Sequence, residues 1–325
     1  MTRFSLRNWP SWATTRNLTR AIWITGGLLV VVSLAFAAYY YRDRFYAQAP
    51  LSPAERALRE AEQAVRENPS DPDLRVHLAA LYYENHLYDR AFEAASQVLK
   101  AYPNHEAALL LAGMAAVQQH RLEEAIPLLE RFIALRKDRP GANADLQLEM
   151  AYYFVGLGYV TLGQSDKAIE ALQAALRISP TDADALYQLG VAYQSQGQCE
   201  KALAAFEQAV RLVPDFVDAY QGLAQCYGAL GQEDRRLYAE GMVAFGEKRY
   251  RTARAKLEQA VERLPDYAPA WLGLGLVYEK LGDLEAAQQA LARALELAPH
   301  DLAIEHAYGR VQAARQATPV QEAQP

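Results

Sequence analysis

Residues 183–216 read ADALYQLGVAYQSQGQCEKALAAFEQAVRLVPDF, and the architecture of the whole chain can be worked out from this stretch. The large side chains of Leu186, Leu189 and Tyr193 recur at i, i+3 and i+7, which is the spacing of one helix face. A short turn rich in glycine and polar residues follows, and a second apolar run leads to Pro214. Because proline cannot continue the helical hydrogen-bond ladder, the stretch predicts two helices joined by a turn and closed by a proline.

The same residues return along the chain with a period of 34. The clearest copies are 149–182 and 268–301. The closing prolines are separated by 34, 77, 34, 51 and 34 residues: Pro69, Pro103, Pro180, Pro214, Pro265 and Pro299. One insertion of nine residues and one extra half-unit account for the two long intervals. Such a fixed period is the signature of a repeat architecture.

These units closely resemble the tetratricopeptide repeat, whose pattern is W-x2-L-G-x2-Y…A-x3-F…P. In 183–216 the matching residues are Leu186, Leu189, Gly190, Tyr193, Ala202, Phe206, Ala209 and Pro214. The resemblance extends from about residue 53 to residue 316. It implies an all-α, helix-turn-helix solenoid of about six repeats plus half-units. We expect Gly190 to let the paired helix approach closely, with Ala202 and Ala209 meeting it.

The phase of the repeats predicts the domain boundaries. We expect a first repeat block at 53–139 and an insertion at 140–148. A second block, which ends in a capping helix, follows at 149–316, and a disordered tail at 317–325. Residues 217–233 read as a first-type helix without a clear partner, and another unit follows at 234–267. We therefore expect a bend, a long helix pair or a change of superhelix there, unless one unit has simply drifted.

An uncharged run covers Ala21–Tyr41, and as a helix it would span about 31 Å, close to the hydrocarbon core of about 30 Å. Trp23 and three tyrosines lie near its ends, where aromatic rings favour the headgroup level. The run predicts one transmembrane helix, followed by a linker at 42–52. A buried core helix and a cleaved signal peptide, with a small-residue site at Ala35–Ala37, are the alternatives.

Basic residues predict the orientation of this helix. Residues 1–20 contain four arginines and no acidic residue, whereas two arginines follow the run. The positive-inside rule therefore places the basic segment 1–20 in the cytoplasm and the repeats outside, on a single-pass inner or plasma membrane. A cleaved signal peptide would also export the repeats.

Composition excludes several function classes. The chain has 325 residues, 51% of them hydrophobic, which is too apolar for a disordered protein. The net charge of −6 combines +5 in residues 1–50 with −11 in the remainder, and gives no reason to expect nucleic-acid binding. The six histidines lack metal-ligand spacing, and neither a P-loop nor a nucleophile elbow occurs. We expect no cofactor, no metal and no enzymatic activity.

The two cysteines exclude a disulfide scaffold and a four-cysteine zinc site. Cys199 begins the second helix of its unit, and Cys226 lies late in the following helix. An up-down-up path brings these ends to the same side of the solenoid. Outside the cytoplasm a disulfide could persist there; two independent, partly buried thiols are the alternative.

The resemblance also implies a binding groove, lined by fixed positions of the first helix of each repeat. Carried onto this sequence, the groove residues are Val76, Tyr83, Leu110, Met114, Val117, Met150, Tyr153, Leu157, Val160, Tyr187 and Val191. The Lys and Asn residues with which some family members clamp a carboxylate are absent. The groove is apolar and aromatic, so we expect it to take an apolar helix or extended segment, unless packing or the N-terminal helix buries it.

The sequence thus predicts a membrane-anchored scaffold that binds partner proteins during assembly, biogenesis or quality control of envelope proteins. The identity of the partners is open, and a homo-oligomer is compatible with the sequence. The alternative is a structural or self-associating subunit of a larger membrane complex.

Overall fold

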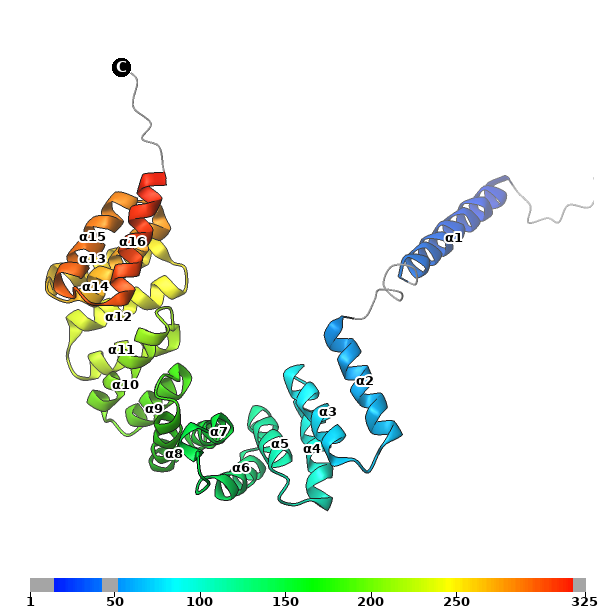
Figure 1. Ribbon diagram of the computed structural model, residues 1–325. Helices are drawn as coiled ribbons and strands as arrows, with labels where there is room; N and C mark the ends of the chain where they lie inside the picture. Colours follow the sequence, from blue (N-terminus) through cyan, green and yellow to red (C-terminus); the bar gives the residue numbers. More distant parts are fainter. Residues whose placement is uncertain (1–14, 43–51, 318–325) are drawn as a thin grey trace, which may run out of the picture. The chain divides into compact units, whose positions relative to one another are not determined.

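The computed structural model describes residues 15–42 and 52–317 (Figure 1). Most of the basic segment, most of the linker and the tail lie outside the described residues. The chain divides into two compact units, 1–60 and 61–325, which are described separately. In the described ranges every regular element is helical, and this confirms the all-α prediction.

The helix bounds follow the predicted period. The elements are α1 (Thr15–Tyr41), α2 (Pro53–Glu67), α3 (Pro72–Glu84), α4 (Tyr88–Ala101), α5 (Glu106–Gln118), α6 (Leu122–Arg136), the 3-10 helix η2 (Ala142–Ala144), α7 (Leu146–Thr161), α8 (Ser165–Ile178), α9 (Ala183–Ser195), α10 (Cys199–Leu212), α11 (Val217–Ala229), α12 (Glu233–Gly246), α13 (Tyr250–Arg263), α14 (Ala268–Leu281), α15 (Leu284–Leu297) and α16 (Leu302–Ala317).

The first unit contains α1. Its segment Trp23–Tyr41 is long and apolar enough to cross a membrane, and its side chains are exposed. A signal sequence near the N-terminus has the same composition. At the start of α2, Ser52 and Glu55 form a capping box: Ser52 Oγ accepts from the Glu55 N–H at 3.2 Å, and Glu55 Oε2 accepts from the Ser52 N–H at 2.9 Å.

In the second unit, successive helices pack side by side as helix-turn-helix pairs (Figure 1). Each turn between paired helices places one residue in the left-handed conformation, with φ between 57° and 83°. These residues are His86, His120, Gly163, Gly197, Gly231, Lys248 and Gly282. They are spaced by one repeat period except at two points. The insertion lengthens the interval from His120 to Gly163, and only half a period separates Gly231 from Lys248.

The short interval explains the extra half-unit. The turns at Gly231 and Lys248 are both of the kind that joins two helices of one repeat. Helix α12 therefore completes the repeat that α11 begins, and it also begins the repeat that α13 completes. Accordingly, each first helix contacts the next one in the series α3, α5, α7, α9 and α11. Beyond α11, the first helices that contact one after another are α12, α14 and α16. The expectation that the helix at 217–233 lacks a clear partner was wrong, because α11 pairs with α12.

The glycines of the first helices receive a large side chain. In five first helices, a Cβ atom built on one glycine would lie 2.5–2.7 Å from a Leu or Phe side chain on the second helix of the same repeat. The pairs are Gly113–Leu129, Gly156–Leu172, Gly190–Phe206, Gly241–Leu257 and Gly275–Leu291. The atoms nearest to Gly190 belong to the ring of Phe206, and Ala202 and Ala209 are buried on the same second helix.

A recurring hydrogen bond joins neighbouring repeats. A tyrosine on a first helix bonds to a Glu or Gln on the preceding second helix, at 2.6–3.3 Å. The partners lie 20 residues apart in every pair except Tyr159 and Glu130, where they lie 29 apart. The nine inserted residues, which include η2, therefore leave this contact between repeats intact.

Candidate partner-binding surface

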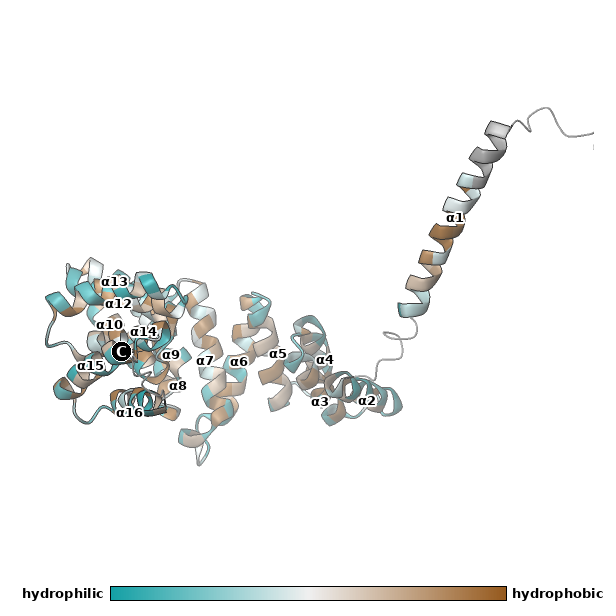
Figure 2. Ribbon diagram, turned by 90° about the horizontal axis from the view of Figure 1, so that it is seen from above, coloured by the Kyte–Doolittle hydropathy of each residue, from teal (hydrophilic) through white to brown (hydrophobic). Residues whose placement is uncertain are grey.

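The predicted groove residues lie on the first helices α3, α5, α7 and α9, whose common surface we call the first-helix face. Three of them do not present a surface: Leu110, Met114 and Val117, all on α5, are buried, with 5–7% exposure. Tyr83 from α3 and Tyr153 and Leu157 from α7 pack on the same apolar cluster. Figure 2 shows α5 and α7 as mainly hydrophobic. The binding proposal therefore rests on the other eight residues.

Helix α7 carries the most accessible apolar surface of this face. Met150 is 36% exposed, while Tyr153, Leu157 and Val160 are half-buried. Leu146, the first residue of the helix, is 68% exposed. Leu146, Met150, Tyr153 and Leu157 stand at i, i+4, i+7 and i+11, so they form one apolar stripe along α7. Sequence reasoning missed Leu146 because it was assigned to the insertion 140–148. Its helical spacing from Met150 was the signal that could have found it.

The neighbouring helices extend the stripe unequally. On α9, Tyr187 and Val191 are half-buried, and the Tyr187 ring lies 5.1 Å from the ring of Phe216 between centroids. On α3, Val76 and Tyr83 are half-buried on the far side of the buried helix α5. Six predicted residues therefore lie on the contacting helices α7 and α9 and keep some exposed surface: Met150, Tyr153, Leu157, Val160, Tyr187 and Val191.

Acidic side chains border this stripe. Asp182 caps α9, with its Oδ1 accepting from the N–H groups of Asp184 and Ala185 at 2.9 and 3.0 Å. Burial, aided by the neighbouring Asp182 carboxyl, raises the pKa of Glu149 to about 7. Burial and Asp182 also raise the pKa of Asp184. Burial together with these aspartates raises the pKa of Tyr153 to about 12.

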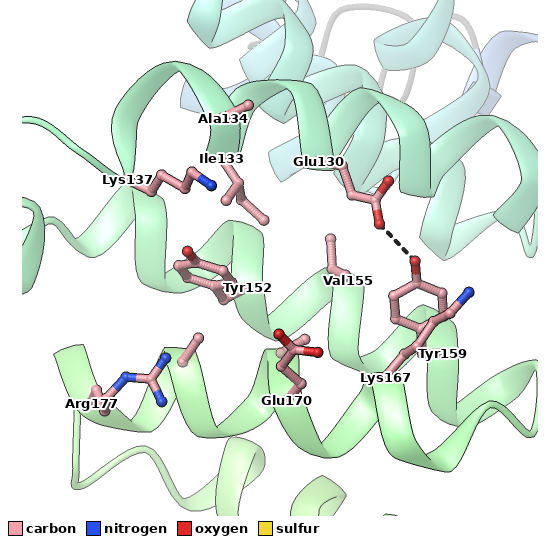
Figure 3. A pocket seen from close by; sticks show the side chains of 12 residues that line it. Glu130, Ile133, Ala134, Lys137, Tyr152, Val155, Tyr159, Lys167, Glu170 and Arg177 are labelled. Carbon is pink, nitrogen blue, oxygen red and sulfur yellow. Dashed lines mark hydrogen bonds between the residues drawn. The ribbon is translucent and has the colours of Figure 1, made fainter.

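A pocket of about 560 Å³ lies on the other side of α7, between α6 and α8 (Figure 3). Tyr152, Val155 and Tyr159 form its α7 side, and Tyr159 donates to Glu130 at 2.6 Å. Lys137 and Arg177 lie near Tyr152, whereas Lys167 lies over the Tyr159 ring, 5.1 Å from its centroid. The pocket is lined by both acidic and basic side chains, so its charges do not favour a ligand of either sign.

The residues described in the two ranges contain no group of three or more His, Cys, Asp or Glu side chains that could hold a metal ion. The geometry of the first-helix face is suited to holding a polypeptide segment, because it offers an apolar stripe with a polar border rather than an enclosed reaction chamber.

Cys199 and Cys226 are brought together, as their places on α10 and α11 predicted. Both are free thiols, and both are buried. Burial, with Cys199 as hydrogen-bonding neighbour, raises the pKa of Cys226 to about 12. Since the thiolate is the reactive form, this environment disfavours oxidation.

We expect two titratable thiols per chain in denatured, unreduced protein isolated from its own membranes. The measurement is a thiol count with a chromogenic disulfide reagent, before and after reduction. A Cys199→Ser variant is the control and should give one thiol in both counts. A count of zero that rises to two on reduction would establish the disulfide.

Comparison with known proteins agrees with the repeat pattern. Family models described as TPR repeat and tetratricopeptide repeat match residues 156–197, 183–216 and 244–316. A model described as anaphase-promoting complex, cyclosome, subunit 3, matches residues 54–132. No curated protein matches the chain.

Solved structures of helical repeat proteins are similar to parts of the chain. A crystal structure of MamA has 28% sequence identity and a TM-score of 0.47. The match covers 53% of this chain and 95% of the MamA chain. YrrB, described as a TPR protein with an unusual peptide-binding site, has 19% identity, a TM-score of 0.41 and coverages of 77% and 97%. A repeat protein from Parabacteroides merdae has 14% identity, a TM-score of 0.46 and coverages of 86% and 98%.

Proposed function

Because the chain is a tetratricopeptide repeat protein, we propose that it is a membrane-anchored scaffold that binds partner proteins through its first-helix face. The observation that carries the proposal is the α7 stripe, where Leu146 and Met150 expose apolar side chains beside half-buried Tyr153. Exposed apolar side chains that form a continuous stripe are typical of interaction sites.

The proposed anchor is Trp23–Tyr41, with the N-terminus in the cytoplasm and the repeats on the other side of the membrane. The length and composition of this helix support anchoring. The arginines on its N-terminal side support the orientation. A scaffold in this position would act on envelope proteins during their assembly, biogenesis or quality control.

The double variant Leu146→Asp/Met150→Asp is expected to lose partner binding while the repeats stay folded, because both side chains are exposed. A photo-crosslinking residue at position 153 of the full chain, in its native membranes, would capture partners for mass spectrometry. We expect at least fivefold fewer crosslinks in the double variant than in the wild type.

Leu302→Asp is the matched control, because Leu302 is 67% exposed at the start of α16, away from this stripe. It should leave the crosslinks unchanged. Undiminished crosslinks in the folded double variant, or an equal loss in the control, would show that the α7 stripe does not bind partners.

A further inference from the structure

In two repeats an acidic residue in the first turn of the first helix pairs with a basic residue that ends the same unit. In the unit 72–105, Asp73 lies 3.5 Å from His105, measured from Oδ1 to Nε2. In the unit 106–139, Glu106 Oε1 lies 2.5 Å from a guanidinium nitrogen of Arg139. In both units, the last residue thus provides a basic side chain for the acidic side chain of the first turn.

The unit 149–182 has no such pair, as is also true of 183–216, which ends in Phe216, and of 268–301, which ends in Asp301. The first residue of 149–182 is Glu149, and its last residue, in the place of Arg139, is Asp182, so that two carboxyl groups meet. Glu149 Oε1 is buried, and no hydrogen-bond donor reaches it. No Lys, Arg or His side chain of the described residues forms an ion pair with Glu149, Asp182 or Asp184. We call these three residues the acidic edge.

The acidic edge is continuous with the apolar stripe of α7. Glu149 precedes Met150 directly, and the charges of Asp182 and Asp184 act on the phenol of Tyr153. Asp145, at the start of the same helix, is already engaged by Arg136 at 2.9 Å. Among the described residues, the carboxyl groups of the acidic edge therefore lack a cation, and they lie beside exposed apolar side chains.

We infer that the first-helix face at α7 and α9 binds a partner segment that combines apolar residues with lysine or arginine. The apolar residues of the segment lie on Leu146, Met150 and Tyr153, and its cation lies beside the carboxyl groups of the acidic edge. Charge complementarity of this kind selects among partners that offer similar apolar surface. The inference rests on the proposed function and specifies its partner class.

Three short synthetic peptides of equal length test the inference against the full chain in nanodiscs of neutral phosphatidylcholine. One alternates Leu and Lys, one alternates Leu and Glu, and one alternates Ser and Lys. Fluorescence anisotropy of labelled peptides gives each Kd, with empty nanodiscs as the blank. We expect the Leu-Lys peptide to bind at least tenfold more tightly than either of the other two, since both surface properties are needed.

The double variant Glu149→Gln/Asp184→Asn should raise the Kd of the Leu-Lys peptide about tenfold. The Kd of the Leu-Glu peptide should not rise. The matched control is Glu123→Gln/Glu262→Gln, which removes two exposed carboxylates on the second helices α6 and α13. It should change neither Kd.

The inference is overturned if the wild type binds the Leu-Lys and Leu-Glu peptides equally, if it binds no Leu-Lys peptide, or if the acidic-edge variant behaves like its control. Equal binding of both leucine peptides that is lost in Leu146→Asp/Met150→Asp would overturn only the charge preference and leave the proposed function intact. Crosslinking in native membranes tests that function separately.

Discussion

Replacing Phe206 with alanine is expected to lower the free energy of unfolding by about 3–5 kcal/mol, the cost of removing a large buried aromatic side chain. The ring is fully buried. It lies between two helices, because a Cβ atom built on Gly190 of α9 or on Gly222 of α11 would be 2.5 Å from it. One side chain therefore packs against its own repeat and against the next.

The glycines provide the second half of this prediction. Gly190→Ala should destabilise the wild type by about 1–3 kcal/mol, because the ring has little room to move. In the Phe206→Ala background the same change should be neutral or stabilising by up to about 1 kcal/mol, since alanine favours helix over glycine. This reversal of sign is the signature of direct contact in a double-mutant cycle.

Urea unfolding of the full chain in detergent, followed by far-ultraviolet circular dichroism, measures these changes. Phe216→Ala is the control, because the Phe216 ring is only half-buried, and it should cost less than half as much as Phe206→Ala. Equal costs for Gly190→Ala in the two backgrounds would contradict the packing of glycine against the ring.

The sequence was sufficient to predict what depends on local spacing. The repeat period, the helix pairs and the nine-residue insertion follow from prolines and apolar positions, since each repeat contacts only its neighbours. The sequence did not predict which side chains contact each other between two helices. The residue that occupies the space above Gly190 lies on another helix, and composition alone did not distinguish Phe206 from Ala202.

Two further features show why the binding face was only partly predicted. Helix α5 reads EAALLLAGMAAVQ, and a helix without a polar face is buried all round. This signal contradicts an exposed groove at Leu110 and Met114. The double use of α12 was harder to see, because Lys248 takes the left-handed turn position that Gly231 occupies half a period earlier, and lysine gives no sign of a positive φ.

Glu149→Gln is expected to stabilise the folded protein at pH 8 by roughly 1–2 kcal/mol and to have little effect at pH 5. The folded pKa of Glu149 is about 7, against an ordinary value of 4.5. A raised folded pKa means that the stabilising contribution is complete below pH 4.5 and is lost as the pH rises through 7. Above pH 7 the wild type holds a charged Glu149 beside Asp182, whereas glutamine stays neutral and can still donate to Asp182.

The magnitude lies below the full value of such a shift because solvent reaches part of the Glu149 side chain and screens the charges. Thermal unfolding of the full chain between pH 5 and pH 8 measures the effect, with Glu123→Gln as the control for removing an exposed carboxylate. A difference between Glu149→Gln and wild type that does not change with pH would contradict the raised pKa. The stability difference between Glu149→Gln and wild type can also be measured with the Leu-Lys peptide present. A ligand that binds only the folded state and relieves the repulsion stabilises the wild type selectively. Loss of the difference would therefore show that the cation of the peptide acts on these carboxylates.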